Sequence, residues 1–118
     1  MELFKPEIIS EPISKEKFQE LIEIGKCFGG VVKVVVDIER EILSMNCELH
    51  CDCADQLVDN ESEWPNLWGA NVYISKGFVI YTSLINIRPQ DNNKSDMVRR
   101  EDVKEKMEKI INKLIFNK

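Results

Sequence analysis

Glu48 and His50 stand two positions apart in a stretch that alternates polar and apolar side chains. In a β-strand, residues i and i+2 point to the same face of the sheet. The alternation therefore predicts that this carboxylate and this imidazole share one face. Because a histidine beside a carboxylate can transfer protons at neutral pH, we take His50 and Glu48 as candidate catalytic residues.

Asn86 and Arg88 show the same spacing, since they alternate with Ile85 and Ile87. The pattern predicts that the amide and the guanidinium project together from another strand. A guanidinium suits a carboxylate or a phosphate, because its N–H groups form charge-assisted and bidentate hydrogen bonds. This pair is therefore a candidate binding site for a small anionic ligand.

Two more predicted strands carry polar residues in the same alternating manner. In one strand, Asn71 is expected to point to the face opposite that of Val72. In another strand, Asp37 and Glu39 alternate with apolar neighbours. If the strand ends are neighbours, these groups meet on one open face of the sheet. The long polar loop after Arg88 could then close over a ligand.

Each of these residues also has a purely structural explanation. An antiparallel sheet often has one solvated face, where polar residues need no function. Asp52 is expected to cap the N-terminus of a short helix, and Asp37 and Glu39 stand where a strand ends and a turn begins.

The four cysteines provide a competing site. Cys47, Cys51 and Cys53 lie close in sequence to the only histidine and supply ligand types that zinc prefers. However, structural zinc sites usually combine a short knuckle with a second, distant pair. Strand alternation would also turn His50 away from Cys47 and Cys51. We therefore expect buried free thiols and no cofactor.

A mixed metal site is the second alternative. Glu48 and His50 could hold a divalent ion together with Asp37 or Asp52. With a single histidine in the chain, a site built on two or three histidines is excluded.

The elements that would position these residues follow from hydrophobic periodicity and turn signals. Strands are predicted at residues 7–10, 31–39, 41–45, 47–51, 68–75 and 78–88. Helices are predicted after Ser14, after Asp52 and, with Val103, Met107, Ile110, Ile111 and Leu114 on one face, at the C-terminus. This order predicts one α+β domain over residues 1–118, with helices packed on one face of a mixed or antiparallel sheet in two layers.

Composition excludes several classes of protein. The chain has 118 residues and a formal net charge of −5. It therefore lacks the surplus of Lys and Arg that non-specific binding to a phosphate backbone requires. It has no apolar run near the roughly 20 residues that span a bilayer and no signal-peptide pattern at its start. We expect a cytoplasmic protein whose partners include neither nucleic acid nor a membrane.

Four segments resemble a family of short prokaryotic proteins catalogued as a domain of unknown function. They are Val-Asp-Ile-Glu-Arg at 36–40, Cys-Glu-Leu-His at 47–50, Leu-Trp-Gly-Ala-Asn-Val-Tyr at 67–73 and Ile-Asn-Ile-Arg-Pro at 85–89. The resemblance runs from about Glu11 to Leu114. Cys47 stands where the family pattern has glycine.

The resemblance implies that ten residues are characteristic positions, and it implies no activity. These are Asp37, Glu39, Glu48, His50, Asp52, Trp68, Gly69, Asn71, Asn86 and Arg88. The candidate ligand-binding residues are accordingly Asn71, Asn86, Arg88, Asp37, Glu39 and Trp68.

Two functions from different classes remain open. The first is a domain that binds a small anionic ligand or a metal on the open sheet face, with or without catalysis by His50 and Glu48. The alternative is a protein-interaction or regulatory module that forms a homodimer through the sheet face or the loop from Trp64 to Trp68.

Overall fold

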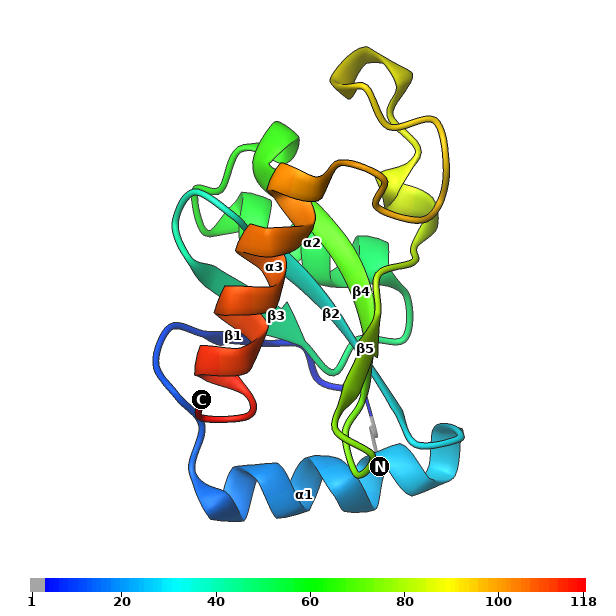
Figure 1. Ribbon diagram of the computed structural model, residues 1–118. Coiled ribbons are helices and arrows are strands. Elements are labelled where there is room, and N and C mark those ends of the chain that lie inside the picture. The colour runs from blue at the N-terminus through cyan, green and yellow to red at the C-terminus, as the bar shows by residue number, and fades with distance from the viewer. Residues whose placement is uncertain (1–3) are drawn as a thin grey trace.

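The computed structural model describes residues 4–118 and shows an antiparallel sheet with helices around it (Figure 1). The strand order is β1-β3-β2-β4-β5. The strands are β1 (Glu7–Ile9), β2 (Val31–Asp37), β3 (Ile42–Met45), β4 (Leu67–Tyr73) and β5 (Phe78–Ile80). The helices are α1 (Lys15–Gly25), α2 (His50–Asp59) and α3 (Glu101–Leu114). Short 3-10 turns cover Lys26–Phe28, Trp64–Asn66, Leu84–Asn86 and Pro89–Asp91.

The central strand β2 separates two hydrophobic clusters, because its side chains alternate between the faces of the sheet. Val32, Val34 and Val36 belong to the larger cluster, which also includes Leu21 of α1 and the buried residues of α3. Val35 belongs to the smaller cluster, together with residues of α2. Both faces of β2 are therefore covered.

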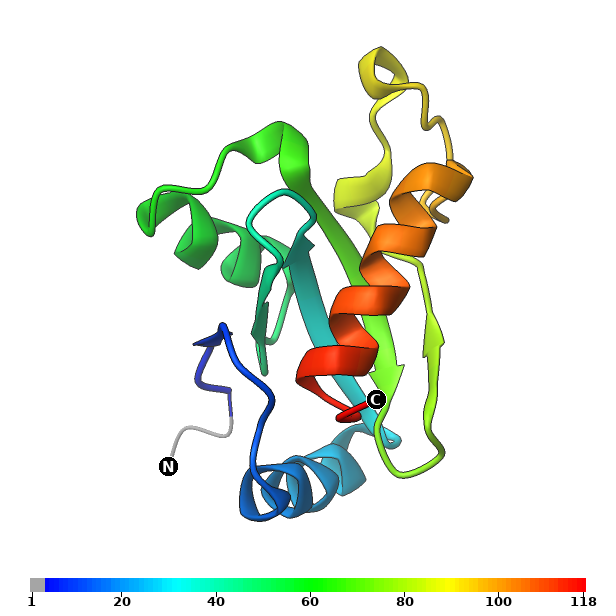
Figure 2. The ribbon, with the colours of Figure 1, turned by 60° about the vertical axis from the view of Figure 1, so that its left-hand side comes forward.

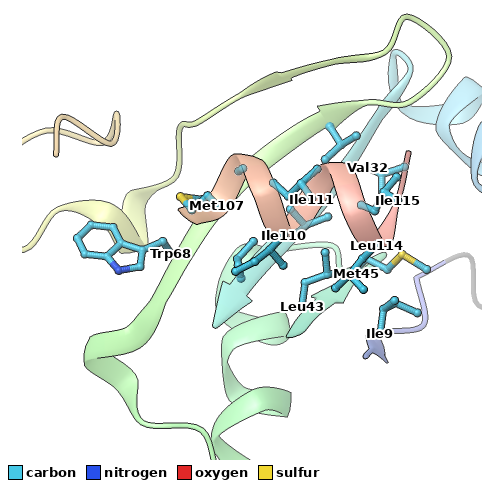
Figure 3. Packing of buried hydrophobic residues seen from close by; sticks show 14 of the residues in the cluster. Ile9, Val32, Leu43, Met45, Trp68, Met107, Ile110, Ile111, Leu114 and Ile115 are labelled. Carbon is cyan, nitrogen blue, oxygen red and sulfur yellow. The ribbon is translucent and has the colours of Figure 1, made fainter. Parts of the chain in front are cut away.

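Helix α3 packs its apolar stripe against one face of the sheet (Figure 3). Its buried residues are Val103, Met107, Ile110, Ile111 and Leu114, which is the set that the sequence predicts. Burial of this stripe, rather than helix propensity, supplies most of the stability of such a helix.

The α+β class and the antiparallel sheet are confirmed, and the arrangement of the helices needs one correction. Helix α3 lies on one face, and α1 crosses one end of the sheet (Figures 1 and 2). Helix α2 lies on the opposite face, where Cys53, Ala54 and Leu57 pack in the smaller cluster. The prediction that all helices share one face is therefore wrong for α2.

The signals at the ends of α1 are confirmed. The hydroxyl of Ser14 accepts a hydrogen bond from the amide of Lys17 at 3.1 Å, as an N-cap does. Gly29 and Gly30 have φ values of 70° and 83°, which only glycine adopts without strain. The 3-10 turn that follows α1 therefore ends at Gly29, and the chain then enters β2.

The predicted strand at 47–51 is wrong. Asn46, with φ of 64°, turns the chain out of β3, and α2 begins at His50. A disulfide joins Cys47 to Cys53 across this turn. Asp52 is not the N-cap, which is Leu49. Asp52 lies in the first turn of α2, and its carboxylate accepts a hydrogen bond from the amide of Leu49 at 3.3 Å.

The predicted strand at 78–88 is wrong beyond Ile80, where β5 ends. Residues 84–86 form a 3-10 turn in which Asn86 is buried. The alternation of apolar and polar residues at 85–88 therefore does not come from a pleated strand. None of the helices within residues 4–118 is long and apolar enough to cross a membrane.

Candidate functional site

A groove of about 430 Å³ opens where α1, the first half of β2 and the segment after β3 meet. Such a volume lies in the range of small-molecule sites. Its lining residues are Phe4, Ile24, Phe28, Val31, Val32, Lys33, Asn46, Cys47, Glu48 and Asn71. One end is apolar and the other is polar.

Aromatic and aliphatic side chains form the apolar end. The rings of Phe4 and Phe28 lie 4.5 Å apart between centroids, and Ile24 and Val31 continue this wall. An aliphatic or aromatic group of a ligand would lose its contact with water there, which is favourable in proportion to the apolar area buried.

Lys33 supplies the positive charge of the polar end. Its ammonium donates to the backbone carbonyl of Glu48 at 2.8 Å, which uses one of its three N–H donors. Lys33 lies opposite Asn71 on the neighbouring strand β4. Lys33 and Asn71 both line the groove, and the Asn71 amide donates to the carbonyl of Thr82 at 3.5 Å.

His50 stands beside this polar end, at the first position of α2. Its Nε2 lies 2.9 Å from the carbonyl of Ala70; a carbonyl only accepts, so Nε2 carries the proton and Nδ1 is unprotonated in the neutral ring. Burial lowers the pKa of His50, the carbonyl of Ala70 and the side chain of Asn71 oppose this, and the Lys33 ammonium lowers the pKa further. The imidazole is therefore neutral at pH 7.

Gly69 explains how the imidazole comes so close to β4. A Cβ at this position would lie 2.6 Å from the Cβ of Ser83 and 3.2 Å from Cδ2 of His50. Both side chains therefore rest directly on the strand backbone, and a larger residue than glycine would displace them.

Asn86 does not project from an open face. Its amide accepts from the Gly69 N–H at 2.9 Å and donates to the Gly69 carbonyl at 3.0 Å. A second donation reaches the carbonyl of Asp96 at 3.1 Å. The side chain thus pairs with the free edge of β4 beyond β5, as the backbone of a neighbouring strand would.

Arg88 is also an interior residue, with 3 % of its surface exposed. Its guanidinium donates to the carbonyls of Trp64 and Leu67 at 3.0 and 2.7 Å, and its Cζ lies 3.8 Å from the ring centroid of Trp68. Trp68 is itself buried. These contacts fix the loop that contains Trp64 and leave Arg88 and Trp68 away from the open face.

Asp37 and Glu39 lie at the end of β2, several residues beyond Lys33. The carboxylate of Asp37 accepts from the amides of Glu39 and Arg40 at 3.0 Å each, which closes the turn between β2 and β3. Glu39 is exposed, with its carboxylate 3.7 Å from the Lys106 ammonium. The structural explanation of this pair as turn residues fits these contacts.

The structure therefore brings Glu48, His50 and Asn71 together and separates them from the other candidates. Sequence reasoning left Lys33 out of the site. A signal existed, because Lys33 interrupts the apolar run of 31–38, but a lysine inside a strand is equally typical of a solvated face.

The cysteine predictions are partly wrong. Cys47 and Cys53 are buried, as expected of core residues, but they form a disulfide instead of free thiols. Cys27 and Cys51 are free and exposed. Within the described residues, no group of three or more His, Cys, Asp or Glu side chains could hold a metal ion.

The fold and this groove define a small α+β domain with a candidate ligand site on one face of an antiparallel sheet. Residues 7–114 match the model of a family described as protein of unknown function, DUF5674. The chain belongs to that family, which confirms the resemblance to a family of unknown function. No curated protein and no solved structure matches the chain.

Proposed function

We propose that the domain binds a small molecule with an apolar part and a carboxylate or phosphate group, in the groove between α1, β2 and the start of α2. The observation that carries the proposal is the Lys33 ammonium, which lines the same groove as Phe4, Ile24 and Phe28. The aromatic wall would contact the apolar part of the ligand, and Lys33 would pair with its anionic group.

In this proposal, Glu48 and Asn71 line the site and His50 is a positioning residue. The imidazole holds the carbonyl of Ala70 and lies against β4 at Gly69, so it fixes the strand that carries Asn71. The ligand-binding set is therefore Lys33, Asn71 and Glu48, with Phe4 and Phe28 as the apolar wall.

Replacement of Lys33 by methionine tests the proposal, because it keeps the length of the side chain and removes the charge. We expect the affinity for 3-phenylpropanoate and for octanoate, measured by isothermal titration calorimetry, to fall at least about tenfold, as for loss of a charge-assisted hydrogen bond. Lys94→Met, at an exposed position in the loop before α3, should leave both affinities unchanged.

Two results would contradict this proposal. The wild-type domain could bind neither anion, or Lys33→Met could bind them as tightly as the wild type. Thermal unfolding of both variants checks that they are folded.

A further inference from the structure

We infer that the ligand of this groove carries a positive charge beside its negative one, as an α-amino acid with an apolar side chain does. The inference rests on the proposed function and narrows its ligand class. Two observations lead to it: the ammonium of Lys33 lines the groove, and within residues 4–118 an acidic side chain in the same groove has no partner.

The acidic side chain is that of Glu48. It is exposed and lines the groove together with Lys33. The ammonium of Lys33 contacts the backbone carbonyl of Glu48, and within residues 4–118 the Glu48 carboxylate forms neither an ion pair nor a hydrogen bond. Two opposite charges thus line one groove without neutralising each other.

The charges of the groove decide between an anion and a zwitterion. A simple anion paired with Lys33 would also lie in the groove that Glu48 lines, and like charges repel each other. In an α-amino acid, the ammonium and the carboxylate are attached to one carbon, so each can face the group of opposite charge. Its side chain would extend toward Phe4 and Phe28, at the apolar end.

Three probes that differ in one charged group test the inference by calorimetry. They are L-phenylalanine, 3-phenylpropanoate, which lacks the ammonium, and 2-phenylethylamine, which lacks the carboxylate. We expect the wild type to bind L-phenylalanine about tenfold tighter than either analogue, as for one charge-assisted hydrogen bond. Glu48→Gln should remove the advantage over 3-phenylpropanoate, and Lys33→Met the advantage over 2-phenylethylamine.

A matched control and the outcomes keep the two proposals separate. Glu63→Gln changes an exposed acid outside the groove and should alter none of these ratios. If 3-phenylpropanoate binds as tightly as L-phenylalanine and needs Lys33, the zwitterion inference is overturned while the anion site stands. If none of the three probes binds, both proposals are wrong.

Discussion

At the scale of single residues, the polar side chains divide into those with partners inside the fold and those that line the groove. The side chains of Arg88, Asn86 and Asp37 form hydrogen bonds with backbone groups. Lys33, Glu48 and Asn71 line the groove. Chemical type alone did not separate the two groups, because a guanidinium is as well suited to a backbone carbonyl as to a ligand carboxylate.

Arg88→Met should reduce stability rather than binding. The change keeps most of the buried stem but leaves the carbonyls of Trp64 and Leu67 without their donors, so we expect a loss of about 3 kcal/mol in the free energy of unfolding. Urea denaturation measures it, and Arg99→Met at an exposed position should change stability by less than about 0.5 kcal/mol. If Arg88→Met is as stable as the wild type, Arg88 is not a structural residue and becomes a candidate for ligand binding again.

His50 should make stability depend on pH in a defined window. Burial lowers its pKa in the folded state below the ordinary 6.5, so the unfolded chain binds a proton more readily. The stabilising contribution is therefore complete above about pH 6.5 and is lost as the pH falls toward the folded-state pKa.

Two measurements check this pH dependence. His50 is the only histidine, so a single imidazole resonance in an NMR titration reports its pKa, which we expect below 6.5. His50→Gln should flatten the fall in stability just below pH 6.5. A titration midpoint at or above 6.5, or the same fall in the variant, would show that the imidazole is not held neutral by burial.

At the scale of elements, the sequence predicts the helices and strands whose apolar residues are buried on one regular face. The stripe of α3, the cap of α1 and the hairpin between β2 and β3 were all predictable. The strand at 47–51 was not, because Asn46 takes a left-handed conformation and a disulfide closes the following turn. Neither feature leaves a mark on hydrophobic periodicity.

The predicted strand at 78–88 is wrong over residues 81–88 for a different reason. The polar positions of that segment face inward to the backbone of β4, where Asn86 takes the place of a strand partner for Gly69. Periodicity of two residues could not distinguish this arrangement from a strand with one solvated face. Glu48 and Asn71 line the same groove, but Glu48 comes from the turn before α2 and not from a pleated strand.

The Cys47–Cys53 disulfide should stabilise the turn that carries Glu48 and His50. It closes a short loop, with a sequence separation of 6, and the entropy of such a closure corresponds to about 2 kcal/mol. Urea denaturation with and without a reducing dithiol should show a difference of that size. Cys53→Ser should abolish the dependence on reductant, whereas equal midpoints for the wild type in both conditions would contradict a structural role of the bond.

At the scale of the whole molecule, the sheet is covered by α3 on one face and only in part by α2 on the other (Figure 2). The groove lies on that partly covered side, near the end that α1 crosses. A second cavity of about 420 Å³ lies between Ser14 and the C-terminal residues, lined by Ile13, Phe18 and Phe116. Its charged lining residues are Lys15 and Lys118, and no acidic side chain lines it. Because Lys33 and Glu48 both line the first groove, we assign the ligand to the first.

The most direct test of the binding site is an NMR titration of the ¹⁵N-labelled domain with L-phenylalanine and 3-phenylpropanoate. We expect saturable shifts at the amides of Lys33, Glu48 and Asn71, together with Phe28 at the apolar end. Shifts that gather instead around Ile13, Phe18 and Phe116, or no shifts with either compound, would contradict it.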